Sequence, residues 1–389
     1  MDLIKLKTRI QSFAIFRGLL KEKVISSLLS YLENPSVAAY SEFVGNLYET
    51  GALSIGEHIK DICENNENIY VRLVGSGKTV PEYIKSCVAE ELNILQAAAD
   101  LTPECLQGLL DWQGFLPAFG VSEVDITESF AYRVKNIGRY GYGIYAKNRM
   151  FFIDEENSIV PVANPDKTRF SDLVDYEAER QIIIDNTKAL LCGKPAANIL
   201  LTGDAGTGKS STVKAVANEM FAEGLRIIEV RKEQLYAIPK ILNELSENPL
   251  KFVLFIDDLS FLKDDDNFNT LKAVLEGSVS AKSENVVIYA TSNRRHIIKE
   301  KFSDREGDDV HRNDTMQELI SLSERFGIHV TFQKPSKQTF LHIVHHLAKM
   351  YGINMDNSEL ELQAERFALE RGGRSARLAR QFIDGILSK

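Results

Sequence analysis

The fold of this chain is decided by the stretch Gly203-Asp204-Ala205-Gly206-Thr207-Gly208-Lys209-Ser210. It matches the phosphate-loop pattern G-x-x-x-x-G-K-[ST] at every fixed position. An apolar, strand-like run at 198–202 precedes it, and a helix-compatible stretch at 211–221 follows it. Glycines in such a loop let backbone N–H groups turn toward phosphate oxygens, and the start of the next helix adds a positive dipole end. The stretch therefore predicts a phosphate-binding loop between a strand and a helix.

Two side chains of this loop carry specific chemistry. Lys209 can bring a positive charge to the β- and γ-phosphates of a nucleotide, and the hydroxyl of Ser210 can bind Mg²⁺. We therefore expect ATP and Mg²⁺ as ligands, with Lys209 also acting in catalysis. The loop residues expected to bind the nucleotide are Gly203, Asp204, Ala205, Gly206, Thr207, Gly208, Lys209, Ser210 and Ser211.

A pair of carboxylates follows a second apolar run, Phe252–Ile256. The run is typical of a strand buried on both faces, and its carboxyl end would face the ligand crevice of a parallel sheet. We expect Asp257 to reach Mg²⁺, usually through a water, and Asp258 to polarise the attacking water. The alternative is a solvated pair of carboxylates that ends a strand.

A third strand-like run, 286–290, ends in the polar residues Thr291-Ser292-Asn293. Asn293 can donate to the γ-phosphate or hold the attacking water. Many strands end in such turns, so this pattern alone is weak. Arg294 and Arg295 follow at once, and phosphate, a neighbouring subunit, nucleic acid and solvent all remain open as their partners.

Arginines near the C-terminus are candidates for sensing nucleotide. Arg325 precedes the last strand-like run, 328–332, where it could leave its own site and stabilise phosphoryl charge in a neighbouring one; a surface ion pair is the alternative. Arg374, Arg377 and Arg380 recur every three residues, which predicts one shared helix face. Of these, Arg377 best suits a nucleotide-sensing role, with Arg374 as the second choice and a plain basic face as the alternative.

Composition sets broad limits. The chain has 389 residues, enough for two or three domains, and its net charge of −9 argues against a nucleic-acid coat protein. No apolar stretch is long enough to span a bilayer, and the N-terminus lacks a signal-peptide core. Four scattered cysteines without a C-x-x-C pair indicate reduced thiols. We expect a cytoplasmic protein without membrane partners.

The pattern along the chain predicts three parts. Residues 1–165 are expected to form a mainly helical domain for partner recognition, with a β-hairpin made of 142–145 and 150–153. Residues 166–333 alternate five apolar runs with helical patterns, which predicts an α/β domain with a parallel five-stranded sheet flanked by helices. Residues 334–389 are helical throughout and are expected to form a lid.

Other features have ordinary interpretations. Val74–Thr79 imitates a phosphate loop after a strand-like run at 69–73, but Arg72 stands where the pattern needs glycine. The histidines at 342, 345 and 346 lack carboxylate or cysteine partners at ligand spacing, so we expect surface or packing roles. The aromatic residues Trp112, Phe115 and Phe119 are expected in the N-terminal core.

Taken in order, these elements resemble the AAA+ ATPases over residues 170–389. The phosphate loop resembles Walker A and Asp257-Asp258 resembles Walker B. Asn293 is similar to sensor 1, Arg325 to the arginine finger and Arg377 to sensor 2. Fuller strings, such as Leu254–Phe261 and Tyr289–His296, are similar to one bacterial family, domain of unknown function 815, which is described only as ATP-binding.

The resemblance implies ATP binding, hydrolysis and an oligomer whose arginine completes a neighbour's site, but no substrate. It also implies that Leu173 and Val174 line the adenine pocket. One departure matters: most AAA+ proteins carry Glu at the position of Asp258. Because Asp is one methylene shorter, water would be held less well and turnover would be slow.

Three interpretations of the whole chain compete. It could be an ATPase that remodels or regulates a protein partner, a nucleic-acid-associated ATPase resembling a helicase loader, or a slow nucleotide-dependent binding switch. Residues 234–239 lack the glycine of a threading pore loop, and a dedicated DNA-binding motif is missing from the sequence. We therefore favour an ATPase that acts as a homo-oligomer on a protein partner.

Overall fold

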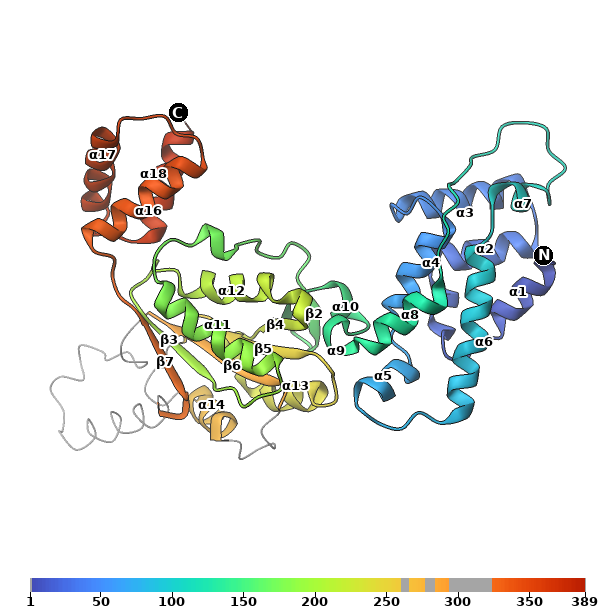
Figure 1. Cartoon of the computed structure of the whole chain (residues 1–389), viewed down its shortest axis with the longest axis horizontal. Helices are drawn as coiled ribbons and strands as arrows, with labels where there is room; N and C mark the ends of the chain where they lie inside the picture. The colour runs from blue at the N-terminus through green and yellow to red at the C-terminus, as the bar shows by residue number, and fades with distance from the viewer. Residues whose placement is uncertain (1, 260–265, 277–283, 294–323, 389) are drawn as a thin grey trace. The chain divides into compact units, whose positions relative to one another are not determined.

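The computed structural model describes residues 2–259, 266–276, 284–293 and 324–388 (Figure 1). Arg294 and Arg295 lie outside these ranges. The chain divides into two compact units, Met1–Lys147 with Glu247–Pro249, and Asn148–Ser246 with Leu250–Lys389. The domain bounds that the sequence predicted, at 165 and 333, stay predictions.

The first unit is helical. Many of its helices begin where a short polar side chain accepts a backbone N–H of the first turn, as Ser36, Ser54 and Asn68 do for α3, α4 and α5. The helices are α1 (Leu3–Gln11), η1 (Arg17–Lys21), α2 (Lys23–Glu33), α3 (Val37–Glu49), α4 (Ile55–Glu64), α5 (Ile69–Gly75), α6 (Glu82–Ala99), α7 (Pro103–Gln107), α8 (Ile126–Lys135), α9 (Ile137–Tyr140) and α10 (Ile144–Lys147).

Three aromatic residues were expected in the N-terminal core, and this prediction was wrong for Trp112 and Phe115. Phe119 is buried and packs edge-on against Phe43. Trp112 is 50% exposed and Phe115 88% exposed. Both lie between α7 and α8, in a loop whose tip stands away from the helical core that would have buried them.

The second glycine-rich stretch, Val74–Thr79, does not follow a strand. The residues before it form α5, which continues through Gly75, so the strand expected at 69–73 was wrong. Lys78 instead donates to Glu247 at 2.6 Å. This stretch therefore lacks the strand that a phosphate loop requires.

The second unit is built on one seven-stranded sheet in the order β2-β1-β4-β5-β6-β3-β7. All neighbouring strands are parallel except the edge pair β1 and β2. The five apolar runs predicted as strands are confirmed: they form β3, β4, β5, β6 and β7. The strands are β1 (Met150–Ile153), β2 (Ile159–Pro161), β3 (Ile199–Gly203), β4 (Leu225–Glu229), β5 (Lys251–Ile256), β6 (Val286–Ser292) and β7 (Ile328–Phe332).

The sheet is wider than the predicted five strands because a hairpin extends it. Its strands are β1 and β2, and β1 pairs in parallel with β4, so the hairpin belongs to the sheet and not to the N-terminal segment. The run at 142–145 is not a strand: Tyr142 packs in the helical core of the first unit, and Gly143, with φ of 59°, precedes the short helix α10.

Both faces of the sheet are covered. On one face, strand residues such as Val253 and Tyr289 pack with Ile183 of α11 and Val216 of α12. The alternate residues of the same strands are also buried, as in Leu254. In Figure 1, α12 lies above the strands, and α13 and α14 lie below them. These elements are η2 (Phe170–Asp172), α11 (Glu177–Leu191), α12 (Lys209–Glu219), η3 (Phe221–Glu223), η4 (Lys232–Ala237), α13 (Ile238–Leu245) and α14 (Asp266–Glu276).

The C-terminal segment consists of α16 (Lys337–Met350), α17 (Asn357–Glu370) and α18 (Ala376–Leu387), which share one apolar core. Ser375 caps α18 by accepting the N–H of Leu378 at 3.2 Å. Arg374 therefore lies before the helix. The prediction that Arg374, Arg377 and Arg380 share one helix face holds only for Arg377 and Arg380. The role of this segment as a lid stays a prediction.

Two general features concern the described residues. None of their helices is long and apolar enough to cross a membrane. Cys63, Cys87, Cys105 and Cys192 are all free thiols.

The end of β3 is a close approach between two backbones. Gly203 has φ of 138°, and a Cβ placed on it would lie 2.0 Å from the carbonyl oxygen of Phe332. We expect Gly203→Ala to destabilise the fold by at least about 3 kcal/mol, seen as a lower melting temperature. Gly193→Ala is the control, because that glycine has φ of 67° with open space around it, and a loss of about 1 kcal/mol is expected. Equal losses in the two variants would contradict this account.

Candidate nucleotide site

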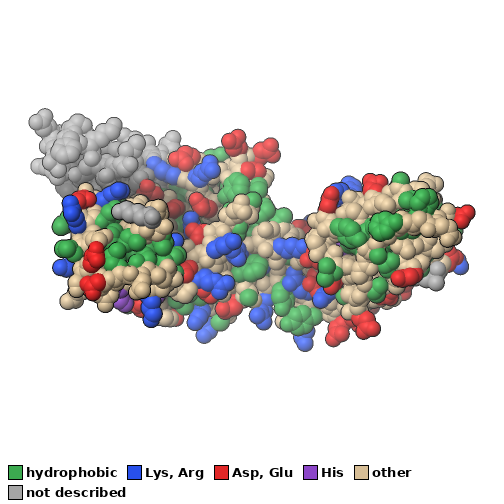
Figure 2. All heavy atoms as spheres, turned by 90° about the horizontal axis from the view of Figure 1, so that it is seen from above, with side chains coloured by type: hydrophobic (Ala, Val, Ile, Leu, Met, Phe, Trp, Pro, Cys, Tyr) green, Lys and Arg blue, Asp and Glu red, His purple; other side chains and the backbone are tan. Residues whose placement is uncertain are grey.

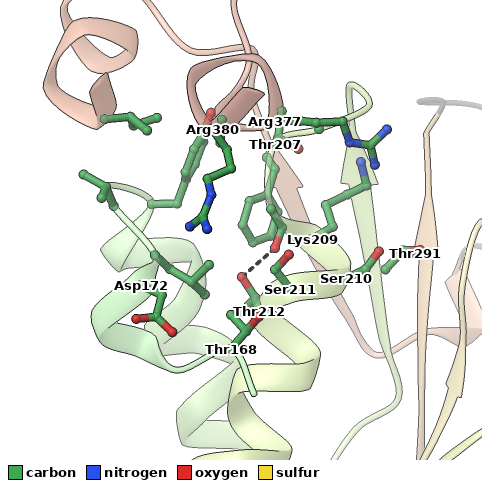
Figure 3. Close-up of a pocket in the computed structure, with 18 of the residues that line it drawn as sticks. Thr168, Asp172, Thr207, Lys209, Ser210, Ser211, Thr212, Thr291, Arg377 and Arg380 are labelled. Carbon is green, nitrogen blue, oxygen red and sulfur yellow. Dashed lines mark hydrogen bonds between the residues drawn. The ribbon is translucent and has the colours of Figure 1, made fainter. Parts of the chain in front are cut away.

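A pocket of about 580 Å³ lies where β3, β5 and β6 end, and residues of α16 and α18 also line it (Figure 3). Its lining contains Gly206–Thr212, Asp257, Asp258, Asn293 and Arg377. Most residues that the sequence singled out are therefore brought together. Gly203, Asp204 and Ala205 precede the part of the loop that lines the pocket.

The start of α12 suits an anion. Gly208 is its N-cap with φ of 97°, and no side chain caps the helix. Lys209 is 4% exposed, and its ammonium donates to the carbonyls of Gly203 at 2.9 Å and Asp204 at 2.8 Å and to Oδ1 of Asn293 at 3.0 Å. An ammonium has three N–H donors, so a phosphate oxygen would replace at least one of these acceptors.

The surroundings of Lys209 shift its pKa in opposite directions. Burial lowers the pKa of Lys209, whereas the carboxylates of Asp204, Asp257 and Asp258 oppose that shift, and the cationic Arg377 adds to it. A bound polyphosphate would add negative charge beside the ammonium and favour its protonated form. Lys209 and an anionic ligand would therefore stabilise each other.

The first carboxylate is fixed by two hydroxyl groups. Ser210 Oγ donates to Asp257 Oδ1 at 2.6 Å, and Thr291 Oγ1 donates to the same oxygen at 2.5 Å. Ser210 begins α12, Asp257 follows β5, and Thr291 lies in β6. Three elements distant in sequence thus converge on one carboxylate oxygen.

The second carboxylate sits on an unusual backbone. Asp258 has φ of 54°, in the left-handed region that non-glycine residues seldom adopt. Its N–H donates to Thr291 Oγ1 at 2.9 Å, and its Oδ1 accepts from Nδ2 of Asn293 at 2.7 Å. The turn directs both Asp257 and Asp258 into the pocket lining, although adjacent residues of a continuing strand would point to opposite faces.

Among the lining residues that sequence reasoning missed, Thr291 joins the two carboxylates. It is buried, lines the pocket, accepts from Asp258 and donates to Asp257. The available signal was its place in a buried strand two residues before Asn293, where a hydroxyl requires a polar partner. Its two partners, Asp257 and Asp258, follow the neighbouring strand β5, so only the sheet pairing identifies them.

Arg377 is the arginine of the C-terminal segment that approaches the phosphate loop. Its N–H donates to the carbonyl of Gly206 at 3.2 Å, and in Figure 3 its guanidinium lies on the same side as the ammonium of Lys209. A Cβ on Gly206 would lie 3.0 Å from Cβ of Arg377. The glycine therefore permits this close approach of α18.

The neighbouring arginines have other contacts. Arg374 forms two hydrogen bonds to the carboxylate of Glu365, at 2.8 and 2.5 Å, and does not line the pocket. Arg380 does line it, donates to Asp384 at 3.0 Å and extends in Figure 3 toward the side where Asp172 lies. Between the two candidates for nucleotide sensing, the geometry favours Arg377 over Arg374.

The other end of the pocket is more apolar. Leu173 and Val174, expected around the base, line it together with Ile343 and Leu347 of α16. Such a surface suits a planar base better than a phosphate chain. The lining residues that were not predicted as site residues include Thr168, Asp172, Tyr176, Arg180, Thr212, Thr291, Phe332, Ile343, Leu347, Arg380 and Gln381.

Arg325 is not part of this pocket. Its guanidinium forms an ion pair with the carboxylate of Glu276 in α14, and its side chain is 26% exposed. The ion pair that the sequence analysis allowed as an alternative therefore exists, with Glu276 as the partner. A role in a neighbouring site stays a prediction.

The oxygen ligands fit Mg²⁺ carried by a nucleotide. Ser210 and Asp257 provide hard oxygens at the pocket, and Mg²⁺ is commonly held by one or two protein groups together with substrate phosphates. Within the described ranges, no group of three or more His, Cys, Asp and Glu side chains could hold a metal by itself. His342 and His345 contact Asp175 and Glu361 instead.

The fold and the site define the class. A phosphate loop after β3, carboxylates after β5 and Asn293 after the intervening β6 make this a P-loop protein of the AAA+ type. The chain belongs to the family described as "Protein of unknown function (DUF815)", which matches residues 146–389. The first 145 residues lie outside that match.

Solved structures of Thermotoga maritima RuvB are similar to this chain. A lysine-to-arginine mutant has a TM-score of 0.39 and 15% identity, covering 56% of this chain and 63% of that one. A structure titled RuvB Holliday junction branch migration motor has a TM-score of 0.35 and 13% identity, covering 56% and 71%. At this level of similarity no property of RuvB transfers to this chain. No curated protein matches the sequence.

The contacts of Thr291 predict a selective effect on metal-dependent binding. Thr291→Val removes the hydroxyl that orients Asp257, so we expect the affinity for Mg²⁺–ATP to fall about tenfold while metal-free ATP binding stays unchanged. Thr291→Ser keeps the hydroxyl and should bind as the unchanged protein does. Titration of a fluorescent ATP analogue with and without Mg²⁺ measures both. A valine variant with normal Mg²⁺ dependence would show that the hydroxyl does not position the carboxylate.

Proposed function

We propose that this chain is an ATPase that binds ATP with Mg²⁺ and uses its hydrolysis, as an oligomer, to remodel or regulate a protein partner. The observation that carries the proposal is the continuous hydrogen-bonded network from Lys209 through Asn293, Asp258 and Thr291 to Asp257 and Ser210. It joins the groups that phosphoryl transfer to water requires along one side of a pocket.

Nucleotide binding is the first step. The phosphate chain would lie along the loop, where the uncapped start of α12, Lys209 and Arg377 all favour negative charge. The base would lie among the apolar residues at the other end. Ser210 and Asp257 would hold Mg²⁺, which when bound neutralises charge on the β- and γ-phosphates.

Hydrolysis requires an oriented water. Asp258 has a second carboxylate oxygen, Oδ2, beyond the one that accepts from Asn293, and this oxygen could accept a proton from an attacking water. The hydrogen bond from Thr291 to Asp257 and the one from Asp258 to Thr291 support two separate duties for the pair. Asp257 would serve the metal and Asp258 the water.

Completion of the site would come from a neighbouring copy. Arg325 does not line its own pocket, yet transition-state charge on the γ-phosphate calls for a further cation. The ion pair with Glu276 would keep this guanidinium extended until another subunit's nucleotide replaces the carboxylate. The net charge of −9 supports a protein partner over nucleic acid.

A slow nucleotide-dependent switch is the second candidate. It is favoured by one observation, that the short Asp258 side chain is tied to Asn293 at 2.7 Å. If that bond persists with nucleotide bound, water would be held poorly and the ATP state would be long-lived. Turnover measurements separate this candidate from the ATPase.

Two substitutions test binding and hydrolysis separately. Lys209→Ala should weaken ATP binding about a hundredfold, because it removes a buried charge-assisted donor worth about 3 kcal/mol. Asp258→Asn keeps the shape and the hydrogen bond from Asn293, so ATP affinity should change little while turnover falls about a hundredfold. Isothermal titration with ATP and a phosphate-release assay provide the two readouts.

Arg374→Ala is the matched control for these variants, since it removes a nearby arginine that does not line the pocket. It should leave ATP affinity unchanged. Retained affinity in Lys209→Ala would refute the phosphate-loop assignment. Normal turnover in Asp258→Asn would move the water-orienting role to another group, and absent turnover in the unchanged oligomer with tight ATP binding would favour the switch.

Arg325 and Glu276 form a matched pair for testing the shared site. Turnover per subunit should rise with protein concentration, and Arg325→Ala should reduce it at least about a hundredfold in the concentrated sample without changing ATP affinity. Glu276→Gln removes the carboxylate charge of this ion pair and should leave turnover at or above its normal level. Phosphate release across a dilution series, with oligomer size tracked by light scattering, measures this.

The control distinguishes a finger from a structural ion pair. If Arg325 served only to bind Glu276, the two substitutions would reduce turnover equally. If turnover per subunit were the same in dilute and concentrated samples, the site would be complete within one chain.

A further inference from the structure

The first unit exposes apolar side chains around the loop that joins α7 to α8. These side chains range from 40% to 88% exposed, and we refer to them together as the loop surface: Tyr48, Leu53, Leu109, Trp112, Phe115 and Val121. Figure 2 looks from above on the side from which this loop projects in Figure 1, and it shows apolar side chains at the surface of that unit. Apolar side chains gathered at one place on a surface are typical of interaction sites, whereas singly scattered ones are normal on any protein.

The loop is held in place from beneath. The hydroxyl of Tyr40 donates to the carbonyl of Pro117 at 2.9 Å, and Gln107 donates to the same carbonyl at 3.2 Å. Gly120 donates its N–H to the carbonyl of Leu53 at 2.8 Å, and Phe119 is buried against Phe43. The base of the loop is therefore part of the fold, while the aromatic tip stays at the surface.

The tip has its own internal contact. Nε1 of Trp112 donates to the carbonyl of Phe115 at 3.3 Å, so the two aromatic residues are linked across Gly114. A Cβ on Gly114 would lie 2.5 Å from the Trp112 ring. The glycine thus lets the indole fold over the turn. An aromatic pair fixed in this way loses little entropy on binding, and Trp is among the residues that dominate binding interfaces.

Along the loop itself every charged side chain is acidic, whereas beside Tyr48 the carboxylate of Glu49 is paired with Lys23. Between Ser86 and Tyr132 the sequence contains no Lys, Arg or His. Asp111 is next to Trp112, and Glu123 is two residues from Val121. The exposed carboxylates Glu42, Glu104, Asp111 and Glu123 form no ion pair within the described part of the chain. A ligand for the loop surface must therefore tolerate or prefer negative charge.

We propose that the loop surface binds a polypeptide segment of a partner that presents apolar side chains together with lysine or arginine. Charge complementarity identifies the occupant: carboxylates without ion-pair partners attract a basic segment and repel the phosphate backbone of nucleic acid. The apolar side chains supply the contact area, with Trp112 and Phe115 as anchors. This site lies outside residues 146–389 and does not depend on hydrolysis by the second unit.

The chain carries its own reporter for this test. Trp112 is the only tryptophan of the sequence, so its emission reports on the loop surface alone. The probe is a synthetic amphipathic peptide of leucine and lysine, about 18 residues or five helical turns long. The comparison probe replaces every lysine by glutamate. We expect the basic peptide to shift the emission of Trp112 with saturable affinity that weakens as salt is added, and the acidic peptide to cause no shift.

Three full-length variants assign the binding to this surface. Phe115→Ser and Asp111→Lys change exposed side chains, so both should fold normally, and each should weaken binding of the basic peptide about tenfold. Leu362→Ser is the matched control, because it removes a leucine that is 72% exposed on α17 of the second unit, and it should bind normally. The Lys209→Ala protein should also bind the peptide normally, which separates this proposal from the ATPase.

Several results would overturn the proposal. Equal affinity for the basic and acidic peptides would show that charge does not select the occupant. Equal weakening by Leu362→Ser would show that the peptide does not bind at the loop surface. A shift of Trp112 emission with protein concentration alone would identify a second copy of the chain as the occupant, and displacement of the peptide by duplex DNA at physiological salt would identify nucleic acid.

Discussion

Parallel backbone pairing of β5, β6 and β3 is the constraint on which the site depends. The register pairs Ile256 with Ala290 and Thr202 with Ser292, so the three strands end at nearly the same level. The pairing continues past β5, where Leu259 donates to the carbonyl of Thr291 at 2.7 Å. Because the strands stop together, the loop after β3, the carboxylates after β5 and the polar end of β6 meet without any direct sequence link. A shift of one residue in this register would turn Thr291 to the opposite face of the sheet and break the network.

The left-handed turn at Asp258 brings a short carboxylate to the pocket lining at a position where the resemblance to AAA+ proteins implies a longer one. A continuing strand would direct Asp257 and Asp258 to opposite faces, and one of them would be lost to the pocket. Asp tolerates φ of 54° better than most residues, since its short polar side chain bonds locally. Thr291 holds the backbone of this turn and Asn293 holds the carboxylate. Backbone conformation thus places Asp258 at the pocket. One of its carboxylate oxygens already accepts a hydrogen bond from Asn293, so only the other is available to water.

The sequence predicts the parts of this protein that local patterns determine. The five apolar runs are strands because residues buried on both faces leave an uninterrupted apolar signature, and the phosphate loop is recognisable because its glycines serve backbone geometry. What failed depended on packing. The run at 142–145 has the composition of a strand, but Tyr142 is buried by distant helices, and β1 instead pairs with β4. Thr291 could not be recognised from the sequence, because its hydroxyl bonds to residues that follow another strand and no sequence spacing links them. Arg374 lies before α18 and Arg377 lies within it, because Ser375 caps the helix between them.

The loop between α7 and α8 is a second place where the sequence does not predict which residues are buried. Phe119 and Phe115 are the same residue type four positions apart, yet one is buried and the other is almost fully exposed. Composition cannot separate them, because the difference lies in hydrogen bonds at the base of the loop. Tyr40 and Gln107 donate to the carbonyl of Pro117, and the carbonyl of Leu53 accepts the N–H of Gly120. Those bonds fix where the chain leaves the core and so decide which aromatic side chains solvent can reach. The loop is anchored by several hydrogen bonds at its base, but Trp112 and Phe115 lie outside the core and add no packing to it. The stability of the isolated chain does not account for such an arrangement, whereas a partner that covers the two rings would.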